Sequence, residues 1–482
     1  MRIRPVLSVT GILTCIFSIS VVPPMLISQI YHDGESDNLL VALLIILGAG
    51  IFMWIFNHRE PPQIHRQEGF LIVVLFWIIL GTLGALPFMF SLDIRFVDAL
   101  FESVSGLTTT GATVLDELDT MQPSILFYRQ EIQWFGGMGL VVLAVAILPI
   151  LGIGGMSLYR AEIPGPMKEE KMLPRLSSSS RSLWLLYVII TVACAFAYWV
   201  AGMSTFDAIS HSLSTVSTGG FSTHDDSLGY FHSATIESIA IAFMVIGAIN
   251  FGVHYTAFRH RAFKPYRQDT EVRGFLLFIG LATSIITLGL WFEHYYGGVI
   301  SDLRNAVFEV VSVITSTGFG TVDFTLWPVM YPTLLITISF IGGCGGSTAG
   351  GMKVLRILIL FRLGYREIVR LPHPRGVFPI KLNGRAIPES TLQSVLGFFS
   401  VYIASFALLM LLMMMTGLDQ VSAYSAIATC INNLGPGLGE VAQSFSGISD
   451  TGKIISVIAM LLGRLEIFSV LVLLHPDFWR DA

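Results

Sequence analysis

Apolar stretches of about 20 residues recur along the whole of this 482-residue chain. A helix of that length crosses the ~30 Å hydrocarbon core of a bilayer. The composition agrees, since 53% of the residues are hydrophobic and only 13% are charged. Typical soluble domains carry about 25% charged residues. The sequence therefore predicts an all-α polytopic membrane protein. Its net charge of −5 argues against nucleic acid as a partner and leaves membrane lipid as the surroundings.

The apolar stretches predict ten spanning helices. Their ranges are 7–30, 39–56, 69–90, 131–151, 182–202, 235–257, 274–292, 328–362, 394–416 and 453–474. Four shorter segments lie among them, near 96–113, 205–222, 303–320 and 420–437, and are rich in Ser, Thr and Gly. They are too short to span, which predicts re-entrant segments lined by protein or water.

The four short segments repeat one pattern. They read "FESVSGLTTTGAT", "SHSLSTVSTGGFS", "FEVVSVITSTGFGT" and "AIATCINNLGPGLG". Each has an amphipathic lead-in, then hydroxyl residues, then a glycine, and we align Gly111, Gly219, Gly318 and Gly435. A period of roughly 100 residues present four times indicates a repeat architecture. The expected fold has four pseudo-symmetric helix–pore-loop–helix repeats around one central pore, with two extra N-terminal helices.

This pattern divides the chain into five parts. They are a two-helix extension (1–60), pore repeat one (61–160), pore repeat two (161–265), pore repeat three with an intramembrane gating loop (266–375) and pore repeat four (376–482).

Basic residues fall in alternate loops of this arrangement. They gather before the first helix, at 59–66, at 160–181, at 259–273 and most densely at 356–385, whereas 31–38 and 203–235 have none. Loops rich in Lys and Arg stay on the cytoplasmic side. Both termini are therefore expected in the cytoplasm.

Backbone carbonyls from four re-entrant loops around one axis can replace the hydration shell of a cation. Glycine supplies the φ values that such loops need. The turns contain no Asp or Glu, which favours a weakly hydrated monovalent cation over a divalent one. The candidate filter residues are Thr109, Thr110, Gly111, Ser217, Thr218, Gly219, Thr317, Gly318, Asn433, Leu434 and Gly435. Exposed loops beyond the turns carry acidic residues that would attract cations.

These features together resemble the Trk/Ktr/HKT superfamily of potassium transporters. The two additional N-terminal helices and the fourth loop, "NNLGPG", are most similar to its bacterial TrkH/TrkG branch. The resemblance implies potassium uptake across the bacterial cytoplasmic (inner) membrane, with potassium at the filter residues and no organic cofactor. It also implies a homodimer that docks a cytoplasmic nucleotide-binding regulatory subunit (TrkA-like). The fourth loop departs from the Thr/Ser-Thr-Gly pattern of the others.

The stretch "FIGGCGGSTAGGMK", residues 340–353, places six glycines inside the predicted helix 328–362. That helix would be about 52 Å long if continuous. Each interior glycine costs ~1 kcal/mol relative to Ala, so we expect the helix to break over Gly342–Gly351. An irregular loop at that depth must face a cavity, which predicts a gate beneath the filter. The same role is implied by the resemblance, with Gly345, Gly346 and Ser347 as gate residues. The spacing does not match a phosphate-binding loop.

Arg464 lies in the last predicted helix, in "MLLGRLEIF". A charge at the centre of a span costs ~2.5–3.5 kcal/mol on insertion scales, so it should face the interior. We expect it below the filter, as an electrostatic barrier or as an anchor for the carbonyls of the glycine loop. The alternative is a structural arginine that binds the backbone of another helix. Glu466, two residues on, faces elsewhere on the helix and is a poor partner. Lys353 either assists Arg464 or extends to the cytoplasmic face.

Other functions remain open at this point. The alternative is a sodium- or proton-coupled potassium symporter with alternating access, although four repeats of one topology favour a pore over the inverted repeats of carriers. An enzyme is not expected, because no HExxH motif, Ser/His pair or intramembrane Asp pair is present. His211 lies alone within the second segment, and we expect a polar packing role for it.

Overall fold

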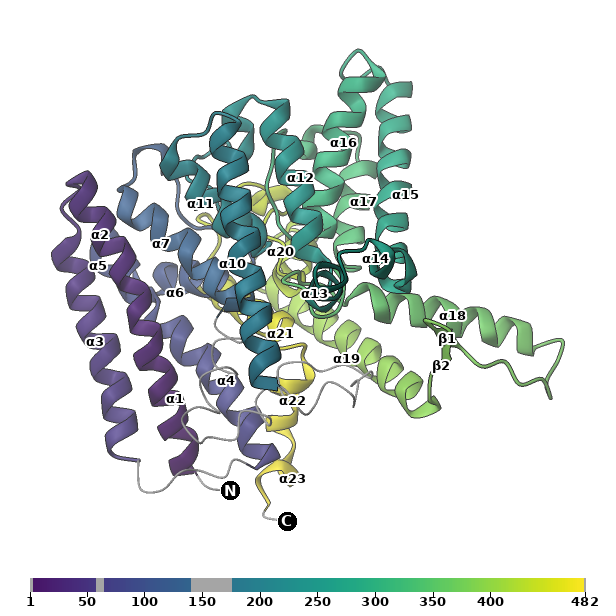
Figure 1. The fold of residues 1–482 in the computed structure, drawn as a ribbon, viewed down its shortest axis with the longest axis horizontal. Coiled ribbons are helices and arrows are strands. Elements are labelled where there is room, and N and C mark those ends of the chain that lie inside the picture. The colour runs from purple at the N-terminus through teal and green to yellow at the C-terminus, as the bar shows by residue number, and fades with distance from the viewer. Residues whose placement is uncertain (1–2, 58–64, 140–175, 481–482) are drawn as a thin grey trace.

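The computed structural model describes residues 3–57, 65–139 and 176–480. Two antiparallel helical elements come first and form one flank of the molecule (Figure 1). The first consists of α1 (Ile3–Ser18) and α2 (Val22–Tyr31), joined by the short turn η1 (Ile19–Val21), and the second is α3 (Ser36–Ile55). They correspond to the predicted two-helix extension.

Four similar units follow, each with a first helix, a short helix, a turn and a second helix. Unit one contains α4 (Arg66–Leu83), α5 (Ala85–Leu92), α6 (Phe96–Leu107), α7 (Pro123–Trp134) and η3 (Phe135–Gly139). Unit two contains α10 (Leu176–Val200), α11 (Thr205–Val216), α12 (Ala234–Ala248) and α13 (Phe251–His260), and α14 (Lys264–Gln268) links it to the next. Unit three contains α15 (Thr270–Phe292), α16 (Val299–Ile314), α17 (Met330–Ser339) and α18 (Val354–Arg370). Unit four contains α19 (Glu389–Met414), α20 (Gln420–Asn432), α21 (Asp450–Arg464), α22 (Phe468–Leu474) and α23 (Pro476–Trp479).

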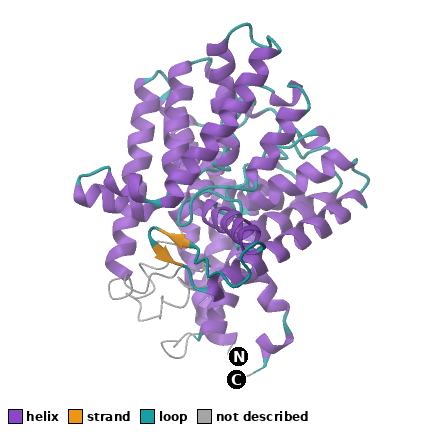
Figure 2. Ribbon diagram, turned by 90° about the vertical axis from the view of Figure 1, so that its right-hand side faces the viewer, coloured by secondary structure: helices purple, strands orange, loops and turns teal. Residues whose placement is uncertain are grey.

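Short 3-10 turns lie in the loops after the short helices: η2 (Leu118–Thr120), η5 (Ser227–Phe231), η6 (Phe324–Leu326) and η7 (Gly439–Val441). The strands of the described residues are β1 (Lys381–Leu382) and β2 (Arg385–Ala386), which pair antiparallel. Asn383 and Gly384 form the hairpin tip with φ of 47° and 79°, the left-handed values of an Asn-Gly turn. Figure 2 shows this hairpin, and Figure 1 shows α18 extending away from the bundle beside it.

Among the described residues, six continuous helical elements are long and apolar enough to span a membrane. They are Ile3–Tyr31, Ser36–Ile55, Gln67–Leu92, Ser182–Val200, Thr270–Phe292 and Glu389–Met414. Each matches a predicted span. The predicted span 131–151 lies outside the described residues from residue 140 onward, as does most of the basic loop 160–181.

Two predicted spans, 235–257 and 453–474, are wrong as continuous helices. The first bends by 99° between α12 and α13, and the second by 109° between α21 and α22. At the first bend the Asn250 side chain caps α13 by accepting from Gly252 N at 2.7 Å. At the second, Glu466 and Ile467 adopt φ of 51° and 56°. Hydropathy revealed neither break, because a helix cap and a change of backbone dihedral angles leave the apolar length of the segment unchanged.

The prediction of a broken helix at 328–362 is confirmed. α17 ends at Ser339, α18 begins at Val354, and the intervening residues form a loop that contains the glycine run. The loop contacts both bends, since Cys344 N donates to Ala248 O at 2.8 Å and Arg464 Nη1 donates to Thr348 O at 3.0 Å. The second helix is therefore interrupted in each of units two, three and four, and the interruptions contact one another.

The four short helices are α6, α11, α16 and α20. These short helices end in buried polar sequence; for example, every residue from 101 to 110 is buried. Each short helix directs its C-terminal end at its turn. The partial negative charge of that end favours a cation there.

Candidate functional site

The four turns that follow the short helices share one backbone conformation. In each, an N–H group donates to a carbonyl five residues earlier, across the end of the short helix. The pairs are Thr110 N to Ser105 O, Gly219 N to Ser214 O and Thr317 N to Ser312 O, all 2.8 Å, and Leu434 N to Thr429 O, 2.9 Å. The residue before each donor has positive φ: Thr109 (55°), Thr218 (53°), Ser316 (53°) and Asn433 (53°). The glycine after each donor also has positive φ: Gly111 (79°), Gly220 (78°), Gly318 (84°) and Gly435 (98°).

This geometry corrects our alignment of the second segment by one residue. Gly220 rather than Gly219 is the equivalent of Gly111, because Gly219 occupies the position of Thr110. Thr218 is then the equivalent of Thr109, and Ser217 lies one position before it. In the third turn, Ser316 belongs to the set and the sequence analysis missed it. The doubled glycine in "STGGF" made the register ambiguous.

The four turns close into a ring. A Cβ built on Gly111 would overlap the carbonyl oxygen of Gly219, one on Gly220 that of Thr317, and one on Gly318 that of Leu434. A Cβ on Gly435 would lie 2.8 Å from the carbonyl oxygen of Thr110. Each glycine therefore packs against the backbone of the next turn, in the order one, two, three, four and back to one. The positive φ and the close approach both require glycine here.

Three of the four turns are also supported by the same side-chain hydrogen bond. Ser105 Oγ donates to Ala112 O at 2.5 Å, Ser214 Oγ to Phe221 O at 2.7 Å and Ser312 Oγ to Phe319 O at 2.6 Å. In the fourth turn, Ser425 Oγ bonds Leu438 O at 3.0 Å, further along the chain. The fourth segment, "NNLGPG", was expected to differ from the other three, and its turn is indeed stabilised by a different serine hydrogen bond.

The glycine loop packs directly beneath this ring. Thr218 Oγ1 donates to Thr348 Oγ1 at 3.2 Å. Gly350 N donates to Ser316 Oγ at 2.6 Å, and Gly351 N donates to Asn432 O at 3.1 Å. The positive-φ residues of turns two and three thus contact the loop through their hydroxyl groups.

The loop is fixed on its other side by α13 and α15. Gly345 N donates to Glu271 Oε1 at 2.7 Å, and Asn250 Nδ2 donates to Gly345 O at 2.6 Å. Phe251 N donates to Gly346 O at 3.1 Å, and Ser347 Oγ donates to Cys344 O at 2.6 Å. The predicted gate residues Gly345, Gly346 and Ser347 therefore form the anchored edge. Thr348 and Gly350, which the sequence analysis did not single out, face the turns.

Arg464 is the last residue of α21 and joins three elements. Its Nη1 donates to Thr348 O at 3.0 Å in the glycine loop and to Thr109 Oγ1 at 3.2 Å in turn one. Its Nη2 donates to the carbonyls of Gly136 and Gly137, at 2.5 Å for Gly137. The expected anchoring of a glycine-loop carbonyl is present. Glu466 pairs with Arg356. It lies beyond the end of α21 with a φ of 51°, so the helical spacing from which we argued does not describe its position.

Lys353 remains inside the fold. Its Nζ donates to Ala349 O, so the side chain turns back onto the glycine loop. Its φ of 76° ends the loop before α18 begins. Two cationic side chains, Lys353 and Arg464, therefore hold carbonyls of adjacent loop residues, Ala349 and Thr348.

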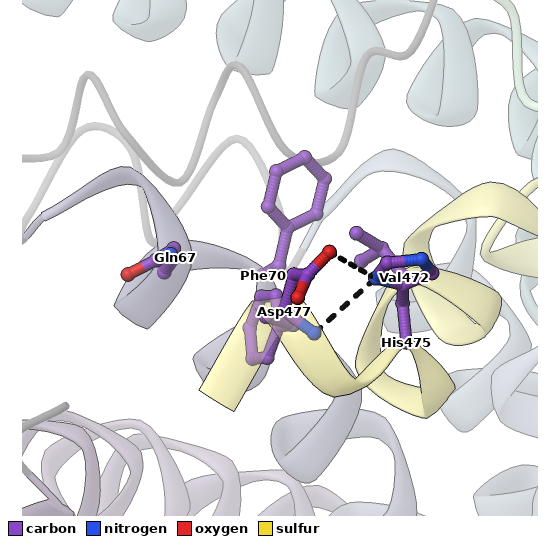
Figure 3. Close-up of a pocket in the computed structure, with 6 residues that line it drawn as sticks. Gln67, Phe70, Val472, His475 and Asp477 are labelled. Carbon is purple, nitrogen blue, oxygen red and sulfur yellow. Dashed lines mark hydrogen bonds and ion pairs between the residues drawn. The ribbon is translucent and has the colours of Figure 1, made fainter. Parts of the chain in front are cut away.

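A cavity of about 400 Å³ lies elsewhere, between the start of α4 and the last two helices (Figure 3). Its lining is Gln67, Phe70, Val472, His475, Asp477 and Phe478. Asp477 N donates to His475 Nδ1 at 3.3 Å. None of the predicted site residues lines it, so it is separate from the ring of turns.

The chain is similar in sequence and in fold to known proteins. Residues 38–480 match the family model described as "TrkH: Cation transport protein". The chain belongs to the TrkH family. Over 486 residues and the whole of both chains, it is 50% identical to the Trk system potassium uptake protein TrkH of Salmonella typhimurium and 49% identical to that of Escherichia coli K12. It is 39% identical to the E. coli potassium uptake protein TrkG.

The fold agrees with a solved TrkH structure. The crystal structure of the potassium transporter TrkH from Vibrio parahaemolyticus superposes with a TM-score of 0.91 at 46% identity, covering 100% of both chains. The resemblance inferred from the four segments is confirmed, and so is the all-α polytopic membrane fold. This TrkH family member is a multi-pass membrane protein of cation transport, and its relatives are named as transporters.

Proposed function

We propose that this TrkH family member takes up potassium through a selectivity filter formed by the four turns. The observation that carries the proposal is the closed ring in which each glycine packs against the backbone of the next turn. Four carbonyl-bearing turns around one axis, fed by four helix C-termini, make a site for a monovalent cation. The four pore repeats and the N-terminal extension, with the boundaries given above, are its structural units.

The glycine loop and Arg464 form the gate in this proposal. The loop contacts turns two and three from below, and the Arg464 guanidinium lies against turn one. An obstruction at this place closes the path by sterics, and a fixed positive charge opposes the passage of cations. Because the loop contacts turns two and three directly, a shift of the loop also acts on the filter.

The environment and partners follow from the same proposal. The chain resides in the bacterial inner membrane with both termini in the cytoplasm; α1 begins and α23 ends at the same end of the molecule (Figure 1). It acts as a homodimer and docks a cytoplasmic nucleotide-binding regulatory subunit. The relatives are named as parts of a "Trk system", a name suited to a membrane subunit that works with others. The basic segment 356–385 is the proposed docking surface.

The test is the ion selectivity of purified protein in liposomes. Gly111→Ser and Gly318→Ser should lower the ratio of potassium to sodium flux, because a side chain at either position overlaps the next turn. Gly364→Ser is the control, since a Cβ at Gly364 meets nothing within 4 Å. An unchanged flux ratio in both filter variants would exclude the filter assignment. Potassium flux that requires a sodium or proton gradient would favour the coupled symporter.

A further inference from the structure

One position behind the ring of turns is polar in three of the four repeats. It lies nine residues before the filter glycine and is occupied by Glu102, His211, Glu309 and Ala426. All four are buried, at 0%, 0%, 1% and 0% exposure. Ionisable side chains at this depth are costly unless they bond. The corrected register at Gly220 is what brings His211 into this set.

Each of the three polar residues holds the segment that leaves its turn. The Glu102 carboxylate accepts from Val114 N at 3.1 Å and from Thr113 Oγ1 at 3.0 Å. His211 Nε2 is 2.9 Å from Ser222 Oγ. Glu309 Oε1 accepts from Thr321 N at 3.1 Å. The fourth repeat has Ala426 and uses the neighbouring Ser425, whose Oγ accepts from Leu438 N at 2.8 Å.

Helix α7 joins turn one to turn two through Arg129. Its Nε donates to Glu102 Oε1 at 2.7 Å in a fully buried ion pair. Its Nη2 donates to Thr113 Oγ1 at 3.1 Å, and its Nη1 crosses to Ser222 O at 3.1 Å. One guanidinium thus fixes the exits of two neighbouring turns relative to each other.

Gln133 extends the same contact toward the filter. It lies one helical turn after Arg129 and so on the same face of α7. Its Nε2 donates to Gly219 O at 2.6 Å, and its Oε1 accepts from Phe221 N at 3.1 Å. Gly219 and Phe221 flank Gly220. A single amide therefore sets the backbone on both sides of the second filter glycine.

We propose that Glu102, Arg129 and Gln133 are positioning residues that determine ion selectivity by fixing the carbonyl geometry of turns one and two. This inference rests on the proposed filter. Both charges of the Glu102–Arg129 ion pair are buried, so neither side chain can exchange its partner for water. Removing one partner would leave the other charge buried and uncompensated. The turns themselves carry positive φ at two residues each, so their shape depends on such external support.

The experiment measures potassium and sodium flux in liposomes for Glu102→Gln and Gln133→Met, with Gly111→Ser alongside. Glu102→Gln keeps an acceptor for Val114 N but loses the charge, and Gln133→Met keeps the length but loses both hydrogen bonds. The matched control is Glu237→Gln. Glu237 is also buried and pairs with an arginine, Arg304, at 2.6 Å, and the hydrogen bonds recorded for it among the described residues go to Arg304 and not to a turn. Thermal unfolding is measured for every variant.

We expect both test variants to lower the potassium-to-sodium flux ratio by roughly two- to thirtyfold, the range for residues that act without touching the ligand. Glu237→Gln should keep the parent ratio even if it lowers the melting temperature. If Glu102→Gln fails to fold, Gln133→Met, which changes no charge, tests whether the positioning residues affect selectivity.

The contrary outcomes separate the two proposals. A lowered ratio in Gly111→Ser with the parent ratio in Gln133→Met would overturn the positioning role and leave the filter standing. A parent ratio in Gly111→Ser would overturn both. An equal loss of selectivity in Glu237→Gln would mean that general loosening of the fold is responsible, which also contradicts the inference.

Discussion

Arg464 Nη1 donates a hydrogen bond to the carbonyl oxygen of Thr348 at 3.0 Å, so a guanidinium at the end of α21 holds the glycine loop in place beneath the turns. The same group reaches Thr109 Oγ1 and two carbonyls of η3. Lysine has no planar fork and could not make these contacts together. These contacts make Arg464 a clamp on the loop, and in the proposed gate its charge also opposes the passage of cations.

Replacing Arg464 should open the gate. Arg464→Ala removes the charge and the hydrogen bonds described above, and deletion of Gly345–Thr348 shortens the loop itself. Each variant should raise potassium flux. Each should also make the flux less dependent on a cytoplasmic regulator. Because the two sites touch, the double variant should show less than the sum of the single effects. Flux in liposomes measures this, with Arg304→Gln as the control. Parent-level flux in a well-folded loop deletion would make the segment a packing element.

Glu271 should stabilise the position of the glycine loop. One carboxylate oxygen accepts from Gly345 N at 2.7 Å and from Leu355 N at 3.1 Å, so it ties the loop to the start of α18. Hydrogen bonds to charged groups contribute ~1.5–3 kcal/mol and neutral ones ~0.5–1.5 kcal/mol, so Glu271→Gln should weaken the seating by about 1 kcal/mol. We expect higher basal flux. Glu293→Gln, at the opposite end of α15, should leave flux unchanged; an equal rise in both would refute the anchoring role.

The corrected register gives a direct comparison between neighbouring glycines. At Gly220, φ is 78° and a new Cβ would overlap the Thr317 carbonyl, whereas at Gly219 it would meet the side chain of Gln133. The Gln133 side chain can shift to make room for a new Cβ, whereas the Thr317 carbonyl is part of the ring backbone and cannot move as easily. Gly220→Ala should therefore reduce potassium selectivity more than Gly219→Ala. Flux ratios of the two variants measure it, and the reverse order would restore our original alignment.

His224 should make the loops beyond turns one and two sensitive to pH. Burial of the ring lowers its pKa, but hydrogen bonds and charges from Asp207 and Asp119 outweigh burial, so the pKa is raised above 6.5. Its Nδ1 is 2.6 Å from Asp119, and its ring stacks on Tyr230 with centroids 3.5 Å apart.

A raised pKa means that this contribution to stability is complete below pH 6.5 and is lost as pH rises through the folded-state pKa. Asp119 is 44% exposed, so we expect about 1 kcal/mol or less. The melting temperature should fall over that window in the parent and not in His224→Gln. His294→Gln, in another exposed loop, serves as the control. If the melting temperature depends on pH in the same way in the parent and in His224→Gln, the predicted contribution of His224 to stability is excluded.

The sequence predicted the elements whose cause is local. Apolar length gave the spans, and the cost of helical glycines gave the break between Ser339 and Val354. The bends after Ala248 and after Arg464 were missed, because hydropathy does not register the Asn250 cap or the positive φ of Glu466 and Ile467.

The site was predictable in outline and not in register. Polar residues followed by glycine located all four turns, but "STGGF" offered two glycines, and only the backbone distinguishes Gly220 from Gly219. Ser316 and Thr348 were missed because a hydroxyl gains its role from the group it meets. Arg129 and Gln133 were also missed, since nothing in α7 alone indicates that this face contacts the next repeat.

The most direct test of the central claim is to locate the ion. Crystals or frozen particles prepared with rubidium or thallium in place of potassium should show the heavy ion inside the ring bounded by Thr110, Gly219, Thr317 and Leu434. The signal should weaken in Gly318→Ser and persist in Gly364→Ser. Heavy-ion signal found only outside this ring, in well-ordered maps of the parent protein, would contradict the account.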